Sequence, residues 1–240
     1  NVAKAEATRR LVTTIERHAR TFGIGRLFCT VKPQAWSFME RMGYEVAETP
    51  GDGEPVTLAK RLIDDAEPWE KEVAELHREL GIPSNYGVRY RLRLMPENAE
   101  CISIGTDIFD RDIKLDKAAG EAWKAMKTDA QRSNIDLQPV SGFRTIGYQA
   151  GLLRKKLNGG MAIGKVLRTS AAPGYSEHHS GRALDLTAPG VAPLTSEFSM
   201  SRAYEWLKAR AGMYGFHESF PNNNRHNIDW EPWHWCYHKH

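Results

Sequence analysis

Cysteine is scarce in this chain, and the few cysteines lie far apart. Cys29, Cys101 and Cys236 are an odd number, and none belongs to a CxxC pair. This spacing predicts neither a disulfide framework nor a cysteine-rich zinc knuckle. We therefore expect free thiols, which favour a reducing compartment.

Long apolar runs and basic clusters are also missing. No apolar stretch approaches the roughly 20 residues that a membrane helix needs, and the net charge is only +3. We therefore expect no membrane span and no nucleic-acid partner. The composition, 41% hydrophobic and 26% charged, is that of a globular protein with a core. The first residues show no secretory signal pattern. Because the chain begins at Asn1 rather than Met, we expect a fragment or a processed product.

Helical and strand patterns alternate irregularly along the chain. Periodicity predicts helices within 3–22, 33–44, 64–83, 117–132, 147–160 and 199–212, and strands within 26–31, 54–62, 135–143, 183–187 and 231–238. Gly23 is expected to end the first helix, residues 49–55 to form a turn, and Asp116 to cap the helix that follows it. Without regular βαβ alternation, the pattern favours an α+β fold.

Histidine is unevenly distributed, since seven of the nine histidines follow residue 177. In "SEHHSGRALDL", residues 176–186, strand alternation turns Asp185 away from the apolar face that Leu184 and Leu186 form. Gly181 allows the preceding loop to fold back and bring His178 over the strand. Taken alone, this pair is more typical of a solvated turn that leads to an aspartate at a strand end.

The last predicted strand offers a third ligand. Alternation in "EPWHWCYH" separates two faces, an apolar one with Trp233, Trp235 and Tyr237 and a second one with His234, Cys236 and His238. Catalytic zinc takes three protein ligands and keeps one open position. We predict His178, Asp185 and His234 as ligands of one Zn²⁺. Glu231, released from the alternation by Pro232, is the predicted general base.

The remaining residues of these segments receive simpler interpretations. We expect His179 to be solvated, and Cys236 and His238 to serve strand packing and the chain terminus. The HExxH zinc helix does not occur in the sequence, so the architecture differs from that of the common zinc peptidases.

These motifs resemble those of the D-alanyl-D-alanine carboxypeptidase/VanY group of zinc peptidases, the LAS family. The resemblance rests on S-x-H-x-x-G-x-A-x-D (176–185) followed by E-x-W-H (231–234), and is supported by "SGFRTIGYQ" (141–149) and "YGFHESFP" (214–221). It covers roughly residues 64–240. It implies a mixed or antiparallel sheet with flanking helices, in a zinc peptidase domain that we assign to residues 63–240.

The resemblance also implies roles for individual residues. It places His178, Asp185 and His234 on zinc and makes Glu231 the base and then the acid. Arg144 would lie near the scissile carbonyl or the terminal carboxylate. Ser176, Gln149 and Ser141 are the implied substrate contacts, although turn capping and helix surface remain open for Ser176 and Gln149.

The implied reaction is hydrolysis of a C-terminal D-amino acid, most simply D-Ala, from a peptidoglycan-type peptide. A D-Ala-D-Ala dipeptidase, a stem-peptide endopeptidase and a non-catalytic zinc-bearing binding module remain alternatives. We expect a cytoplasmic protein, with the cell envelope as the alternative location. The sequence leaves the oligomeric state open.

Residues 1–62 resemble the C-terminal half of a GNAT-type acetyltransferase. The helix, the strand and "FMERMGYE" (38–45) carry this resemblance. The glycine-containing loop that would hold the acetyl-CoA pyrophosphate is replaced by "NVAKAEA". We therefore expect a partial, non-catalytic α/β segment.

Overall fold

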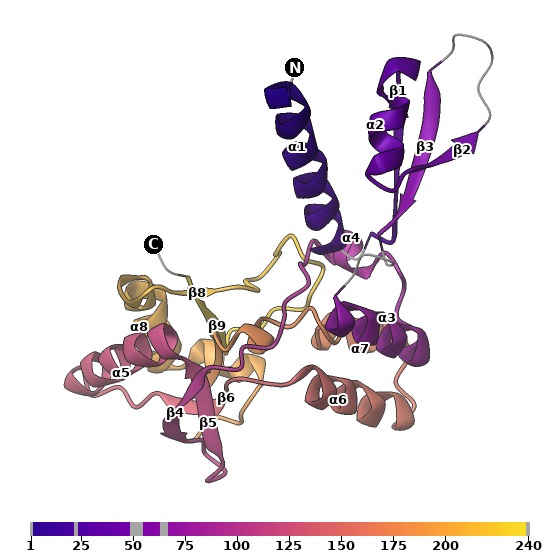
Figure 1. Ribbon diagram of the computed structural model, residues 1–240. Coiled ribbons are helices and arrows are strands. Elements are labelled where there is room, and N and C mark those ends of the chain that lie inside the picture. Colours follow the sequence, from indigo (N-terminus) through magenta and orange to yellow (C-terminus); the bar gives the residue numbers. More distant parts are fainter. Residues whose placement is uncertain (1, 22–23, 49–54, 63–66, 239–240) are drawn as a thin grey trace. The chain divides into compact units, whose positions relative to one another are not determined.

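The protein was analysed as a computed structural model, which describes residues 2–21, 24–48, 55–62 and 67–238. The chain forms two compact units, Asn1–Leu94 and Met95–His240 (Figure 1). The predicted boundary at residue 62 falls inside the first unit, and the division of function at that residue stays a prediction. The predicted helix end at Gly23 and most of the turn at 49–55 lie outside the described residues.

The first unit contains a three-stranded antiparallel sheet with strand order β1-β3-β2. Its elements are α1 (Val2–Thr21), β1 (Arg26–Val31), η1 (Pro33–Ala35), α2 (Trp36–Arg41), β2 (Glu45–Glu48), β3 (Val56–Arg61), α3 (Pro68–Leu80) and α4 (Tyr86–Tyr90). A capping box between Glu67 and Glu70 begins α3, and Gly81, with a φ of 68°, ends it. The helices and strands predicted here are confirmed, whereas β2 and α4 were not predicted.

The second unit carries the predicted metal-binding motifs and contains a four-stranded antiparallel sheet with order β6-β7-β9-β8. Its strands are β4 (Cys101–Thr106), β5 (Asp112–Asp116), β6 (Gln138–Ser141), β7 (Ala183–Thr187), β8 (Phe216–Glu218) and β9 (His234–Tyr237). Its helices are α5 (Lys117–Arg132), α6 (Ile146–Asn158), α7 (Ile163–Thr169), η2 (Glu177–Ser180), η3 (Ser196–Met200), α8 (Arg202–Arg210) and η4 (Ala211–Tyr214). The predicted α+β class with antiparallel strands is therefore correct.

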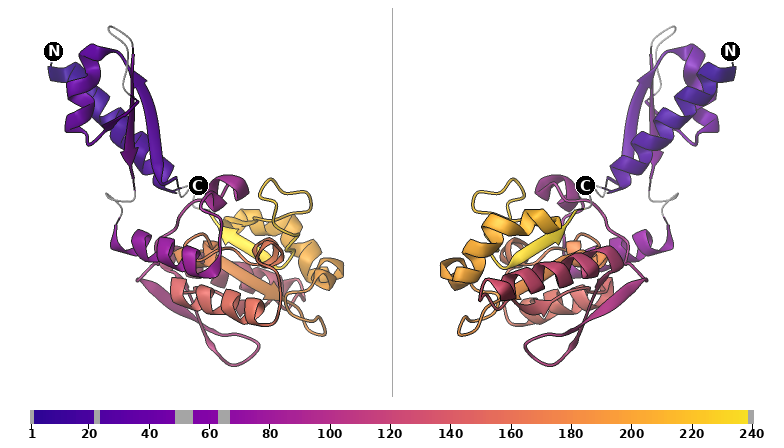
Figure 2. Two further views of the ribbon diagram at one scale, coloured as in Figure 1. Left: turned by 90° about the vertical axis from the view of Figure 1, so that its right-hand side faces the viewer. Right: turned by 90° about the vertical axis from the view of Figure 1, so that its left-hand side faces the viewer.

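The core of this unit lies between the sheet and two helices, α5 and α8 (Figures 1 and 2). Leu184 and Leu186 of β7 and Trp235 of β9 pack there, as alternation predicts. Asp116 caps α5 as expected, because its carboxylate accepts hydrogen bonds from the amides of Ala118 and Ala119. The alternate side chains of β7 and β9 lie on the other face of the sheet, away from this core.

The final strand is shorter than predicted. It begins at His234 instead of residue 231, because the chain turns at 231–233 and the His234 amide donates to the Glu231 carbonyl at 3.0 Å. Pro232, which has no amide hydrogen, sits in this turn. None of the described helices is long and apolar enough to span a bilayer.

Candidate metal centre

Three predicted site residues form one row across the sheet. Asp185 in β7 pairs with Ser141 of β6 on one side and with His234 of β9 on the other. Directly opposed residues of antiparallel strands have side chains on the same face, about 5 Å apart. The register thus brings together residues that are 93 positions apart, from 141 to 234.

His178 reaches this row from the short helix η2, which ends at Gly181. Gly181 has a φ of 70°, and a Cβ on it would lie 2.5 Å from Cys101 Sγ and 2.8 Å from the Asp116 amide nitrogen. Both the left-handed backbone and the close approach require glycine. The loop therefore folds back over the strand, as the sequence predicts.

His178, Asp185 and His234 are all buried, and one ligand atom from each lies within 4.8 Å of the others. His178 Nε2 lies 3.3 Å from Asp185 Oδ2, and His234 Nδ1 lies 3.0 Å from Asp185 Oδ1. Two imidazoles and one carboxylate are a common ligand set of catalytic zinc. The donor chemistry and the spacing fit such an ion.

Hydrogen bonds on the outer side fix both imidazole rings. His178 Nδ1 donates to the Gly142 carbonyl at 2.6 Å, and His234 Nε2 donates to Glu177 Oε2 at 2.9 Å. Each ring therefore turns its other nitrogen toward Asp185. Such outer partners orient metal-binding histidines and set their tautomers.

The two histidines differ in charge. Burial, helped by Arg144, lowers the pKa of His178 to about 4, so this ring is neutral. Burial also opposes a charge on His234, but its hydrogen bonds to Asp185 and Glu177 outweigh burial and raise its pKa to about 10. The environment thus favours a cation between these carboxylates, either a proton on His234 or a metal ion.

Glu231 lies on the wall of the same cavity, partly buried. Burial raises the pKa of its carboxyl group to about 7, although His234 acts in the opposite direction. A carboxyl group with a pKa near 7 can both accept and return a proton at neutral pH. The structure places it beside the three candidate ligands without making it one of them.

The cavity has a volume of about 360 Å³ and combines apolar walls with two cations. Arg144 and Lys156 supply the positive charge, and Leu152, Leu194, Phe220 and Trp233 are among the apolar lining residues. Gln149 and Ser176, both predicted substrate contacts, are buried residues of its lining. Gln149 Oε1 finds no hydrogen-bond partner among the described residues, which leaves a buried acceptor available to a ligand.

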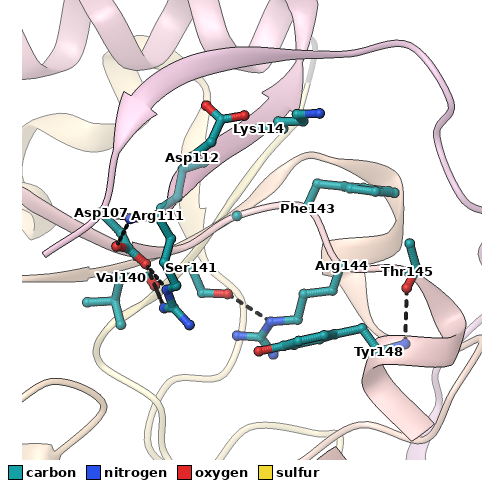
Figure 3. A pocket seen from close by; sticks show the side chains of 12 residues that line it. Asp107, Arg111, Asp112, Lys114, Val140, Ser141, Phe143, Arg144, Thr145 and Tyr148 are labelled. Atoms are coloured by element: carbon teal, nitrogen blue, oxygen red, sulfur yellow. Dashed lines mark hydrogen bonds and ion pairs between the residues drawn. The ribbon is translucent and has the colours of Figure 1, made fainter. Parts of the chain in front are cut away.

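Arg144 lies on the wall shared with a second cavity of about 300 Å³, shown in Figure 3. Its Nε donates to Ser141 Oγ at 2.8 Å, and its Nη2 donates to Asp185 Oδ2 at 2.5 Å. Ser141 lines this second cavity and is not part of the lining of the first. Ser141 therefore helps to position Arg144 through this hydrogen bond.

The expectation that His179 is solvated is wrong. The residue is fully buried; its Nδ1 donates to the Arg144 carbonyl at 2.7 Å, and its Nε2 accepts from the Gly174 amide at 3.1 Å. Burial lowers its pKa to about 4, which fits a neutral ring that ties two loops together. The sequence also gave no sign of Glu177 or Lys156, since their partners come from distant segments.

Comparisons with known proteins agree on one family. Residues 112–240 match the family model VanY, described as D-alanyl-D-alanine carboxypeptidase. The "Putative carboxypeptidase YodJ" of Bacillus subtilis is 30% identical over 124 residues, 50% of this chain and 45% of that protein. A D-alanyl-D-alanine carboxypeptidase of Enterococcus faecalis is 26% identical over 197 residues, 81% of this chain and 67% of that protein. This chain thus spans about half of the first relative's length.

A solved structure is similar as well. The LdcB LD-carboxypeptidase, whose structure is described in terms of peptidoglycan recognition, matches with a TM-score of 0.54 at 27% identity. The match covers 59% of this chain and 69% of that one. The family match at residues 112–240 includes every predicted site residue.

Proposed function

This chain belongs to the VanY family of D-alanyl-D-alanine carboxypeptidases, and we propose that it is a zinc peptidase that removes a C-terminal D-amino acid, most simply D-Ala, from peptidoglycan-type peptides. One observation carries the proposal. His178, Asp185 and His234 converge in the cavity that also holds Glu231, a carboxyl group with a pKa of about 7.

His178, Asp185 and His234 would hold the zinc ion. When bound, zinc supplies a Lewis acid that polarises a carbonyl group and acidifies water. Gly142 and Glu177 keep both imidazoles in the tautomers that such an ion needs. One ion per chain is the expected stoichiometry.

Glu231 moves the proton in the proposed reaction. It takes a proton from the water whose oxygen attacks the carbonyl carbon of the last peptide bond. It returns that proton to the amide nitrogen as the carbon–nitrogen bond breaks, and the D-amino acid leaves as a free amine. Burial raises the pKa of this carboxyl group to about 7 in the metal-free protein, and a nearby metal ion would lower this pKa and favour the charged form that accepts the proton.

Arg144 and Lys156 would stabilise the negative charges of the substrate in this cavity. Arg144 lies within hydrogen-bond distance of Asp185, so its guanidinium can donate to a developing oxyanion in the same region. Lys156 lines the same cavity, where its Nζ donates to Ser170 Oγ at 2.7 Å, and its positive charge suits the terminal carboxylate. The free Gln149 Oε1 is an acceptor for a substrate N–H group.

A panel of stem peptides tests the proposal and separates its alternatives. Mass spectrometry of digests should show loss of one D-Ala from a peptide that ends in D-Ala-D-Ala. Release of the dipeptide or internal cleavage would indicate a dipeptidase or an endopeptidase. Because LdcB is named an LD-carboxypeptidase, the panel includes a tetrapeptide in which an L-configured centre precedes D-Ala. If no peptide is cut by zinc-loaded protein, the remaining alternative is a non-catalytic zinc-bearing module.

For residues 1–62 we keep the proposal of a partial, acetyltransferase-like segment without catalytic function. Its expected consequence is that acetyl-CoA gives no binding heat in calorimetry with the full chain. For the location we propose the cytoplasm, in agreement with Cys29, Cys101 and Cys236 as free thiols. Fractionation with the cell envelope would contradict this location.

A further inference from the structure

A second group of metal-binding side chains lies behind His234. One ligand atom each from Glu177, Cys236 and His238 lies within 4.8 Å of the other two. Cys236 is buried, Glu177 is partly buried and His238 is exposed. The proposed hydrolysis uses none of these three side chains in contact with substrate.

The fold brings the three together by strand alternation and one turn. His234 and Cys236 are alternate residues of β9, and His238 continues this spacing beyond its end. Glu177 in η2 faces the row, because its Oε2 accepts hydrogen bonds from His234 Nε2 at 2.9 Å and Ser219 Oγ at 2.6 Å. Its carboxylate therefore stands between the first ligand group and the second.

A further histidine borders this group. His217 of β8 is the register partner of Cys236, and its ring centroid lies 5.8 Å from that of His238. Side chains of directly opposed residues share one face of the sheet. His217 therefore lies on the same face as Cys236, and either its imidazole or a water molecule would supply a fourth donor.

A carboxylate, a thiolate and imidazoles are donors that suit zinc and chemically similar transition metals. We propose that Glu177, Cys236 and His238 form a second metal site for Zn²⁺ or a similar cation, weaker than the first. Its affinity should be lower because His238 is exposed and because Glu177 already accepts hydrogen bonds from His234 and Ser219. Glu177 would be a ligand of the second site and is the hydrogen-bond partner of His234 in the first, so occupation of the second site would take this partner from His234. Metal binding by Glu177, Cys236 and His238 does not depend on whether the protein hydrolyses peptides.

Cobalt distinguishes the two sites, because only the second contains sulfur. The full chain, stripped of metal and kept reduced, is titrated with Co²⁺ and followed by absorption. The first equivalent should give visible d–d bands alone. A second equivalent should add a sulfur-to-cobalt charge-transfer band in the near ultraviolet.

Variants assign the bands. Cys236→Ser should abolish the charge-transfer band and keep the visible bands, whereas the matched controls Cys29→Ser and Cys101→Ser should keep both. His238→Ala changes an exposed residue, so folding is not at risk, and should weaken the second equivalent at least about tenfold. Saturation at one equivalent without a sulfur band would overturn the proposal. So would a sulfur band that survives Cys236→Ser, or unchanged affinity in His238→Ala.

Discussion

Replacement of Glu231 by Gln separates the proposed proton transfer from metal binding. Glutamine keeps the shape of the side chain but cannot accept the proton of water. Because Glu231 is not one of the grouped ligand residues, Glu231→Gln should still bind one zinc ion. General acid–base catalysis contributes about 10² to 10⁴ in rate, so kcat should fall by at least about a hundredfold.

The same substitution has a calculable effect on stability. Folding raises the pKa of this carboxyl group from 4.5 to about 7, which corresponds to a cost of at most about 3 kcal/mol when the group is charged. Partial exposure to the cavity reduces this figure. The cost is absent below pH 4.5, grows between pH 4.5 and 7, and is constant above pH 7. Metal-free Glu231→Gln should therefore be more stable than the wild type at pH 8 and not at pH 4.

One set of measurements tests the catalytic role of Glu231, and a second tests its effect on stability. Peptide digestion at saturating zinc gives kcat, and metal analysis of the same sample gives stoichiometry. Urea unfolding of chelator-treated protein at pH 4, 6 and 8 gives the free energy of unfolding. Retention of kcat within tenfold would refute the assignment of Glu231 as the base. A stability difference that is the same at all three pH values would refute the argument from its pKa.

Three further variants test other parts of the site. Glu177→Gln removes the charge that orients His234, and calorimetry should show zinc affinity at the first site lowered about 10-fold to 100-fold; unchanged affinity would exclude this role. Arg144→Lys keeps the charge but loses the fork of donors to Ser141 and Asp185, so kcat/KM in the peptide assay should fall at least about tenfold; wild-type kinetics would show that charge alone suffices. Gly181→Ala places a Cβ against Cys101 and the Asp116 amide at a φ of 70°, and thermal unfolding should report a loss of at least about 2 kcal/mol. An unaffected melting temperature would show that the η2–β7 turn can relax.

Local sequence patterns were sufficient to predict which way the side chains of Asp185 in β7 and His234 in β9 point. Alternation in β7 separates Asp185 from Leu184 and Leu186, and the same rule in β9 separates His234 from Trp235. Both follow from the two-residue period of a strand, which needs no knowledge of the partner strand. The register that places Asp185 opposite His234 was not predictable from either segment alone.

The error on His179 has a physical origin. Both rings donate a hydrogen bond to the 142–145 loop, His178 to the Gly142 carbonyl and His179 to the Arg144 carbonyl. The sequence shows only two neighbouring imidazoles before a glycine. Both imidazoles are buried, and the loop that accepts their hydrogen bonds lies more than thirty positions away in the sequence. Glu177 escaped notice for the same reason, since its partners Ser219 and His234 come from later segments.

The charges around Asp185 link metal binding to substrate binding. In the structure Asp185 is held by Arg144 at 2.5 Å and by His234 at 3.0 Å, and both partners carry positive charge. A metal ion held by Asp185 and His234 would take the place of the proton on His234 Nδ1 and would neutralise Asp185, while His234 Nε2 keeps its hydrogen bond to Glu177. The guanidinium of Arg144 would then be free to donate to an anionic substrate group in one of the two cavities that it lines. By linkage, a substrate anion that engages Arg144 should tighten metal binding by the factor by which the metal tightens substrate binding.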